Sequence, residues 1–315
     1  ADAREDAPVR LVPVVAGNAD ERASVVLRRL ELTVSRKLDG LLQGEYRGLM
    51  PSLGSELGET REYQAGDDVR RIDWNVTARM QAPHVRETIA DRELETWVCV
   101  DQSASLDFGT AAMEKRDLVV AAVGAVAVLS SKVGNRLGAL LVREDGIFQI
   151  PARQGRDHYM ALLHRLQTAP RASGPADLAA GIRRLGSPAH RRGLAVVVSD
   201  LLAPDGWQRE LGRVAQRHDV LVVEVIDPRE LELPDVGTLA LVDPETGRLR
   251  EVNTRGSKLR ERYAEAAREQ RAAHARAIRE AGADHVVLRT DRDWLFDLVR
   301  FVALRRRRME ATVNR

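Results

Sequence analysis

From residue 97 onward, short continuous apolar runs alternate with longer stretches in which apolar residues recur every three or four positions. A short apolar run predicts a buried strand, and the longer spacing predicts a helix that packs on it. Buried strands separated by helices are typical of a mainly parallel sheet that is covered on both faces. We therefore predict an α/β fold.

Each predicted element of this region shows one of these two patterns. The predicted strands are residues 97–100, 136–142, 147–151, 193–199, 220–226 and 284–288, and the predicted helices are residues 111–132, 155–166, 176–185, 207–216, 255–281 and 294–304. Residues 231–252 interrupt the alternation with two short apolar runs on either side of Asp243-Pro-Glu-Thr-Gly247, which predicts a hairpin insertion.

Residues 1–95 do not show this regular alternation. Residues 21–42 have the spacing of an amphipathic helix, and residues 84–95 alternate weakly, which predicts a strand that leads into Trp97. The predicted organisation is a flexible leader over residues 1–20, an N-terminal helix and charged-loop subdomain over 21–95, the α/β domain over 96–304 and a basic tail over 305–315.

Two predicted strands end in an aspartate, at Asp101 and Asp200. Because the carboxyl ends of parallel strands meet at one edge of a sheet, both should lie at the same rim. Ser103 and Ser105 follow Asp101 at a spacing of two, so the three side chains could converge on one hard cation such as Mg²⁺, which prefers oxygen ligands. The alternative is structural, because Ser is common in loops and Asp often caps the next helix.

The segment from Gly44 to Met80 is rich in Gly and in side chains of opposite charge, with Tyr63 and Trp74 spaced through it. Arginine–carboxylate pairs there predict a structured loop, which is either a solvated charged surface or a docking surface. The residues we assign to partner binding are Glu59, Arg61, Tyr63, Asp67, Asp68, Arg70, Asp73, Trp74 and Arg79.

Composition narrows the function classes. The 315 residues carry a net charge of only +2, which argues against a nucleic-acid binder. The single cysteine, Cys99, excludes an internal disulfide framework and a Cys-rich zinc site. With no secretory signal and no apolar run that could span a bilayer, we expect a cytoplasmic protein.

The two aspartates and two serines resemble the metal-ion-dependent adhesion site of the von Willebrand factor A fold. That resemblance implies a threonine ligand from the loop that contains Ser173-Gly-Pro-Ala-Asp-Leu178, but Ala176 stands at the expected position. Asp177 is the nearby residue that could substitute for it. The resemblance thus implies a Mg²⁺ or Mn²⁺ site at Asp101, Ser103, Ser105, Asp200 and Asp177, weakened by Ala176.

The pattern Gly58-Glu-x-Arg-Glu-Tyr-x-x-Gly-Asp-Asp-x-Arg-x-Ile-Asp-Trp-x-x-x-Ala-Arg79 resembles the signature of the bacterial domain of unknown function 58 family. Members of that family combine this signature with a von Willebrand A-like domain and are typically encoded beside MoxR-type AAA+ ATPases. The resemblance implies a non-enzymatic adaptor or chaperone-like partner of such an ATPase or of its client, which would bind carboxylates of the partner through the rim.

A metal-dependent hydrolase that uses the carboxylate-rich loop is the alternative. Against it, the seven histidines are scattered, and the sequence contains no HExxH, Gly-x-Ser-x-Gly or phosphate-loop pattern. Ser103 as a nucleophile would need a nearby base, and the spacing suggests none.

Overall fold

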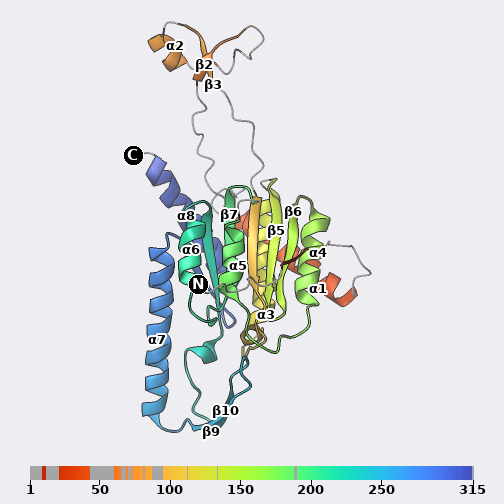
Figure 1. Ribbon diagram of the computed structural model, residues 1–315, viewed down its shortest axis with the longest axis vertical. Helices are drawn as coiled ribbons and strands as arrows, with labels where there is room; N and C mark the ends of the chain where they lie inside the picture. The colour runs from red at the N-terminus through yellow and green to blue at the C-terminus, as the bar shows by residue number, and fades with distance from the viewer. Residues whose placement is uncertain are drawn as a thin grey trace, which may run out of the picture.

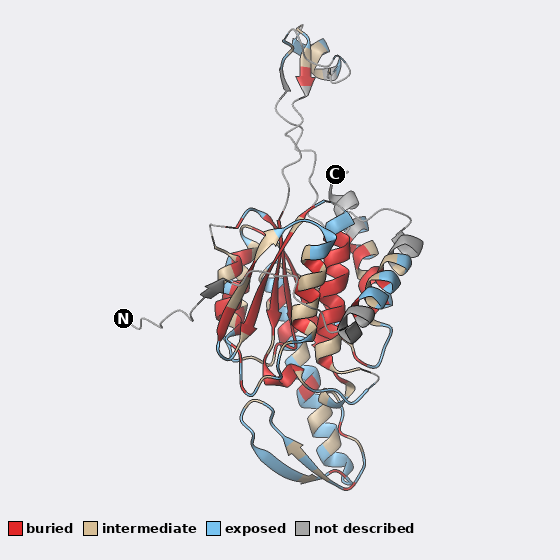
Figure 2. Ribbon diagram, turned by 90° about the vertical axis from the view of Figure 1, so that its right-hand side faces the viewer, coloured by how far each residue is buried: buried red, intermediate tan, exposed pale blue. Residues whose placement is uncertain are grey.

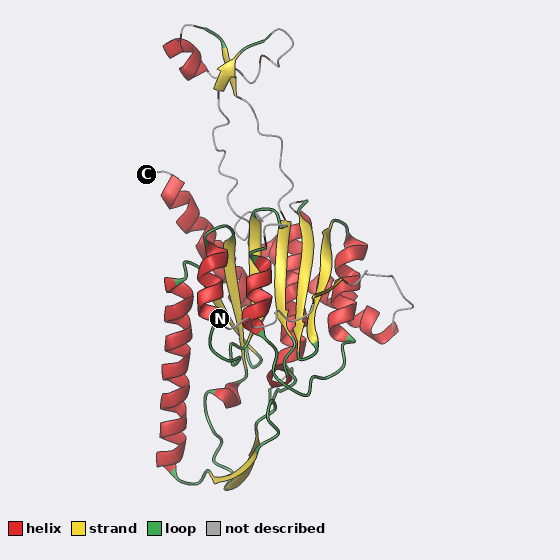
Figure 3. Cartoon of the chain, in the orientation of Figure 1, coloured by secondary structure: helices red, strands yellow, loops and turns green. Residues whose placement is uncertain are grey.

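The computed structural model describes residues 9–11, 21–42, 60–64, 69, 72, 74–80, 82–86, 95–111, 113–132, 134–187 and 190–313. Its centre is a seven-stranded sheet with helices on both faces, which confirms the predicted α/β class (Figure 3). The strands lie in the order β1 (Val9–Leu11), β6 (Gly146–Arg153), β5 (Arg136–Arg143), β4 (Glu95–Asp101), β7 (Gly193–Ser199), β8 (Asp219–Ile226) and β11 (Asp284–Arg289).

The central strand is β4, and it pairs in parallel with both β5 and β7. Strands β7, β8 and β11 continue the parallel order, whereas β6 pairs antiparallel with β5 through the Glu144-Asp145 turn. All residues of β4 and β7 are buried, because helices cover both sides of the sheet. This explains why their sequences are continuous apolar runs.

The helices divide between the two faces (Figure 1). One face is covered by α1 (Glu21–Leu42), α3 (Lys115–Lys132), α4 (Arg156–Gln167) and α8 (Trp294–Val313), and the other by α5 (Leu178–Leu185), α6 (Trp207–Ala215) and α7 (Ser257–Glu280). The innermost helix is α3, in which almost every residue from Leu118 to Ser130 is buried, as its apolar sequence predicts.

Two smaller sheets complete the described elements. The predicted hairpin is present as β9 (Thr238–Val242) and β10 (Leu249–Asn253), which pair antiparallel and are largely exposed (Figure 2). Residues 60–86 contain β2 (Thr60–Glu62), α2 (Trp74–Met80) and β3 (His84–Arg86), and β2 pairs antiparallel with β3. This signature unit is connected to the α/β domain through residues that lie outside the described ranges.

Two predicted boundaries are wrong. The leader contains β1, which pairs with β6, and α1 belongs to the α/β domain, because it packs against α3, α4 and α8. Of the strand predicted over 84–95, the structure describes β3, which pairs within the signature unit, and Glu95, which begins β4; residues 87–94 lie outside the described residues.

The basic tail is likewise not a separate segment. Helix α8 continues through it to Val313, and the buried Arg305 forms ion pairs with Asp284 and Asp219, at 2.5 and 2.6 Å. Two carboxylates at the amino-terminal ends of β8 and β11 therefore hold the start of the basic cluster against the sheet.

Candidate functional site

Asp101 and Asp200 come together at the carboxyl ends of β4 and β7, as the sequence predicts. The parallel register pairs Val100 with Val198, so Asp101 lies beside the end of β7 and its Oδ2 accepts a hydrogen bond of 2.6 Å from the Ser199 hydroxyl. Asp101 is 1% exposed and Asp200 is fully buried. After Asp200 the chain turns through Leu201, which has a φ of 60°, an uncommon value for a residue other than glycine.

The two serines lie in a short 3₁₀ turn rather than in an extended loop. The turn, η3, spans Ala104–Leu106, and the backbone N–H of Ser103 donates a 2.9 Å hydrogen bond to Oδ1 of Asp101. The hydroxyl oxygens of Ser103 and Ser105 are nevertheless only 3.1 Å apart, and both side chains are buried. The sequence spacing thus correctly predicts that these residues gather, although it predicts the wrong backbone.

A lysine enters the same cluster. Lys115, the first residue of α3, is completely buried, and its Nζ donates a 2.7 Å hydrogen bond to Oδ2 of Asp200. The same ammonium group also donates to Oε1 of Glu230. Burial alone would lower the pKa of Lys115, but the charges of Asp200 and Glu230 outweigh this and raise that pKa, so the ammonium stays charged. We call Asp101, Ser103, Ser105, Lys115 and Asp200 the rim.

Glu230 is positioned by the loop that follows β8. Asp227 caps the short η4 helix (Pro228–Glu230) and also accepts hydrogen bonds from Thr110 and Thr290, which tie this loop to two neighbouring segments. The Glu230 carboxylate in turn accepts the backbone N–H of Asp227 at 2.9 Å. These contacts fix the loop, so Glu230 meets Lys115 in a set position.

Arg271 of α7 connects the rim to the buried carboxylate of Glu224. Its guanidinium donates to the carbonyl oxygen of Asp200 at 3.0 Å and to Oε1 of Glu224 at 2.5 Å. Burial would raise the pKa of Glu224, but His274, His285 and Arg271 all face it and lower that pKa to about 2. Glu224 is therefore a fixed negative charge under the rim.

Burial and the neighbouring charge of Asp200 raise the pKa of Asp101 to about 6. Hydrogen bonds from Ser199 and Ser103 act in the opposite direction and limit the increase. Asp101 is thus the rim carboxylate with the least charge compensation, because Lys115 contacts Asp200 and not Asp101 among the contacts of the described residues.

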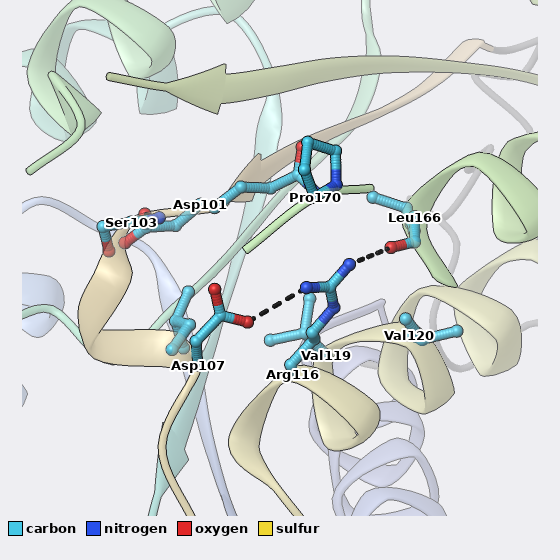
Figure 4. Close-up of a pocket in the computed structure, with 10 residues that line it drawn as sticks. Asp101, Ser103, Asp107, Arg116, Val119, Val120, Leu166 and Pro170 are labelled. Atoms are coloured by element: carbon cyan, nitrogen blue, oxygen red, sulfur yellow. Dashed lines mark hydrogen bonds and ion pairs between the residues drawn. The ribbon is translucent and has the colours of Figure 1, made fainter. Parts of the chain in front are cut away.

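On the α3 side, Asp101 and Ser103 line a small pocket together with Asp107, Arg116 and Pro170 (Figure 4). Arg116 donates to Oδ1 of Asp107 at 3.1 Å and to the carbonyl oxygen of Leu166, at 3.4 Å, which closes the pocket (Figure 4). The remaining space has room for about one water molecule, so it is not a substrate cavity.

The loop expected to supply a further ligand does not do so. Ala176 is 3% exposed and packs in the apolar core on the α5 side. Asp177 is exposed and caps α5, where its Oδ1 accepts the backbone N–H of Ala180 at 2.8 Å. Of the two explanations of Asp177, the structure therefore bears out the helix cap.

The tip of the β9–β10 hairpin reaches back to the rim in both views of the chain (Figures 1 and 2). Glu245 lies in this tip, and its Oε1 is buried without a hydrogen-bond partner, although its neighbours Pro244 and Thr246 are exposed. Burial raises the pKa of Glu245, and so does the charge of Asp200, while Ser105 and Lys115 lower it. The rim thus already faces a carboxylate from its own chain.

In this arrangement the rim already holds a positive charge, because the Lys115 ammonium is bound to Asp200, so a divalent cation does not fit without displacing it. Mg²⁺ and Mn²⁺ also require several oxygen ligands turned toward one point. Both carboxylate oxygens of Asp101 and both of Asp200 accept hydrogen bonds from protein groups, and the two serine hydroxyls bond each other. Within the described ranges, no three His, Cys, Asp or Glu side chains are grouped so that they could hold a metal ion.

The family model described as "Protein of unknown function DUF58" matches residues 59–273, which is more than half of the chain. The chain belongs to the DUF58 family. The match spans the signature unit and most of the α/β domain, including every rim residue.

Relatives of this DUF58 chain occur in mycobacteria. "Uncharacterized protein Rv1480" of Mycobacterium tuberculosis (strain H37Rv) is 55% identical over 290 residues, which cover 91% of each protein. "Uncharacterized protein MAV169" of Mycobacterium avium is 51% identical over 161 residues, which cover 50% of this chain and 95% of that protein.

Among solved structures, the DUF58 chain is similar to the conserved hypothetical protein BatB from Bacteroides thetaiotaomicron, with a TM-score of 0.43, 12% identity, and coverage of 68% of this chain and 99% of that one. It is also similar to the SpRpn10 VWA domain, with a TM-score of 0.38, 11% identity, and coverage of 65% and 93%. The observed seven-stranded, mainly parallel sheet belongs to the predicted α/β class. In the part of the DUF58 chain that the structure describes, no helix is long and apolar enough to cross a membrane.

The DUF58 signature residues are only partly described. Trp74 and Arg79 lie on α2 and are exposed, and Tyr63 is half-buried next to β2. The side chain of Arg61, a β2 residue, is not described. Glu59, Asp67, Asp68, Arg70 and Asp73 lie outside the described residues.

Three residues that shape the rim are not predicted from the sequence: Lys115, Glu230 and Glu245. The available signal for Lys115 is its position at the start of a long apolar helix. Glu230 and Glu245 lie in turns far from the Asp-x-Ser-x-Ser pattern, and no local spacing connects them to it.

Proposed function

We propose that this DUF58 protein is a protein-interaction module that acts as an adaptor or chaperone-like partner of a MoxR-type AAA+ ATPase or of the client of that ATPase. The observation that carries the proposal is the exposure of large apolar side chains on the signature unit. Val69, Trp74 and Met80 are 61%, 70% and 64% exposed. Exposed Trp and Met side chains on a small unit are typical of surfaces that bind another protein.

The rim is the second part of this proposal. At the rim, an acidic side chain of the partner would bind beside Ser105, where Glu245 of this chain now lies. A carboxylate at this position is within reach of a serine hydroxyl and of the Lys115 charge, which supports an acidic rather than a basic ligand.

The test is binding of a purified MoxR-type ATPase from the same organism to immobilised DUF58 protein. Trp74→Ala should weaken binding at least tenfold, because buried interface tryptophans commonly contribute 2 kcal/mol or more, on the order of hot-spot values. Charge reversal at Asp67, Asp68 and Asp73 should weaken it as well.

Phe296→Ala is the matched control, because Phe296 is also exposed, at 51%, but lies on α8. It should bind the ATPase as wild type does. Equal affinities of wild type and Trp74→Ala would contradict the proposed docking surface, and absence of any binding by wild type would contradict the ATPase as the partner.

The alternative, a metal-dependent hydrolase, gains no support from the rim. The hydroxyls of Ser103 and Ser105 bond each other, and no hydrogen bond between either of them and a histidine occurs among the described residues. His274 and His285, the histidines of the neighbouring network, face Glu224 instead.

A further inference from the structure

A fully buried lysine requires a reason, because removing an ammonium group from water is costly unless it is paired. Lys115 is 0% exposed and lies in the same cluster as four residues that resemble metal ligands. Its partners Asp200 and Glu230 have side-chain exposures of 0% and 14%, so the pairs are shielded from solvent.

The Lys115 ammonium group connects three parts of the fold. Its side chain starts at the first residue of α3 and reaches Asp200 at the end of β7, in the rim, and Glu230 in the loop after β8. The ring of Phe108 lies 5.9 Å from Nζ and encloses it further. A fully buried cation held by two carboxylates and a ring is a structural part of the site.

This cation changes what the rim can hold. Lys115 occupies Oδ2 of Asp200, and the backbone N–H of Leu202 occupies Oδ1 at 3.1 Å, so Asp200 has no carboxylate oxygen without a partner. Ala176 offers no oxygen at all in its side chain. A divalent cation at the rim would have to displace Lys115 or accept the like charge of its ammonium group nearby.

We propose that the Lys115 ammonium takes the place of the divalent cation at this rim, so that the site is built and kept in shape without metal. This goes beyond the adaptor function and does not depend on it, because it concerns the isolated protein. The chemical class of ligand follows from it: the rim accepts a carboxylate through the Ser105 hydroxyl and the nearby charge of Lys115, without a metal ion.

The first experiment measures wild-type protein alone. Thermal unfolding is compared in EDTA, in excess Mg²⁺ and in excess Mn²⁺, and Mn²⁺ binding is titrated by electron paramagnetic resonance. The midpoint should be the same in all three solutions, and no stoichiometric Mn²⁺ should bind. One Mn²⁺ per chain that is lost in Asp101→Asn, or a rise of several degrees with either ion, would overturn the proposal.

The second experiment removes the ammonium group. In EDTA, Lys115→Ala should lower the midpoint by roughly 10 °C, because it leaves two carboxylates buried without a counter-charge. Mn²⁺ should then raise the midpoint of this variant by several degrees, and adding Ala176→Thr should enlarge that rise by supplying the hydroxyl that the loop lacks.

Lys132→Ala is the control, since Lys132 lies exposed in the last turn of the same helix. It should unfold as wild type does and show no response to Mn²⁺. A wild-type midpoint for Lys115→Ala in EDTA, or a folded Lys115→Ala that does not respond to Mn²⁺, would contradict the substitution of metal by lysine. If Lys115→Ala does not fold, the Mn²⁺ titration of wild type decides the question alone.

Discussion

Burial determines the charge state of the His218 side chain in this DUF58 protein. His218 is 5% exposed, and burial together with the positive charges of Arg217 and Arg192 and the neighbouring His190 lowers its pKa to about 4. In the unfolded chain its pKa is about 6.5, so the unfolded state binds a proton first as the pH falls. Neutral His218 therefore contributes stability that is complete above pH 6.5 and is lost as the pH falls toward 4.

The substitution His218→Gln should flatten this dependence. We expect the urea midpoint of wild type to fall between pH 7 and pH 4.5, and that of His218→Gln to fall less over the same interval, because one proton-linked group has been removed. Parallel pH profiles of the two proteins would show that His218 is not the group responsible.

At the same scale, sequence reasoning identifies the rim only where local spacing carries information. Asp101, Ser103 and Ser105 are found from their spacing of two after an apolar run, and Asp200 is found because it ends a similar run. Lys115 and Glu230 are missed because their roles depend on a contact between residues 115 and 230, which no local pattern records.

At the scale of elements, the buried strands and most helices are predicted to within a few residues, but the end of α8 is not. A strand covered on both faces is mostly apolar, so β4, β5, β7 and β8 are visible as apolar runs. Helix ends depend on contacts made elsewhere. Helix α8 passes the predicted end at 304 because Arg305 meets two carboxylates from distant strands.

The close approach of α5 to the sheet gives an element-scale prediction. A Cβ at Gly181 would lie 2.4 Å from Cγ2 of Val142 and 2.9 Å from Sγ of Cys99, so α5 can contact β4 and β5 only through a glycine. Gly181→Ala should therefore reduce the free energy of unfolding by about 1–3 kcal/mol, measured by urea denaturation.

Gly212→Ala serves as the comparison for the same substitution in a helix. Gly212 lies in α6, and a Cβ there would have no atom within 4 Å. Alanine should leave stability unchanged or raise it by up to about 1 kcal/mol, since alanine favours the helix. Similar losses at both glycines would show that the contact with β5 is not the cause.

On the scale of the whole molecule, both ends of the sequence build one face of the α/β domain. Helices α1 and α8 pack on each other and on the layer that contains α3, and Lys37 of α1 pairs with Asp293, just before α8, at 2.6 Å. The signature unit is therefore inserted between two elements of one domain, α1 and β4. A division of the sequence at residue 95 could not reveal this, because amphipathic helices do not show which partner they pack against.

The stability of the α/β domain should depend on Arg305, which holds α8 against the sheet. Arg305→Ala removes the ion pairs with Asp219 and Asp284 and should cost roughly 2 kcal/mol of unfolding free energy, a typical value for charge-assisted hydrogen bonds. Arg307→Ala, which removes an exposed arginine two residues later in α8, should have no measurable effect. A cost at both positions would indicate that helix propensity, and not the pairing, is responsible.

The hairpin that carries Glu245 has a consequence for how strongly any acidic partner could bind. A carboxylate tethered to its own receptor competes at an effective concentration that is commonly in the millimolar range. A partner carboxylate must compete with Glu245 for the rim. The partner's apparent affinity is therefore its intrinsic affinity multiplied by the fraction of molecules in which Glu245 leaves the rim open. Glu245→Ala should bind a rim-directed partner more tightly than wild type, whereas Glu251→Ala, on the exposed β10, should not. Because of the hairpin, only partners that also bind a second surface of the protein would then reach a high affinity for the rim.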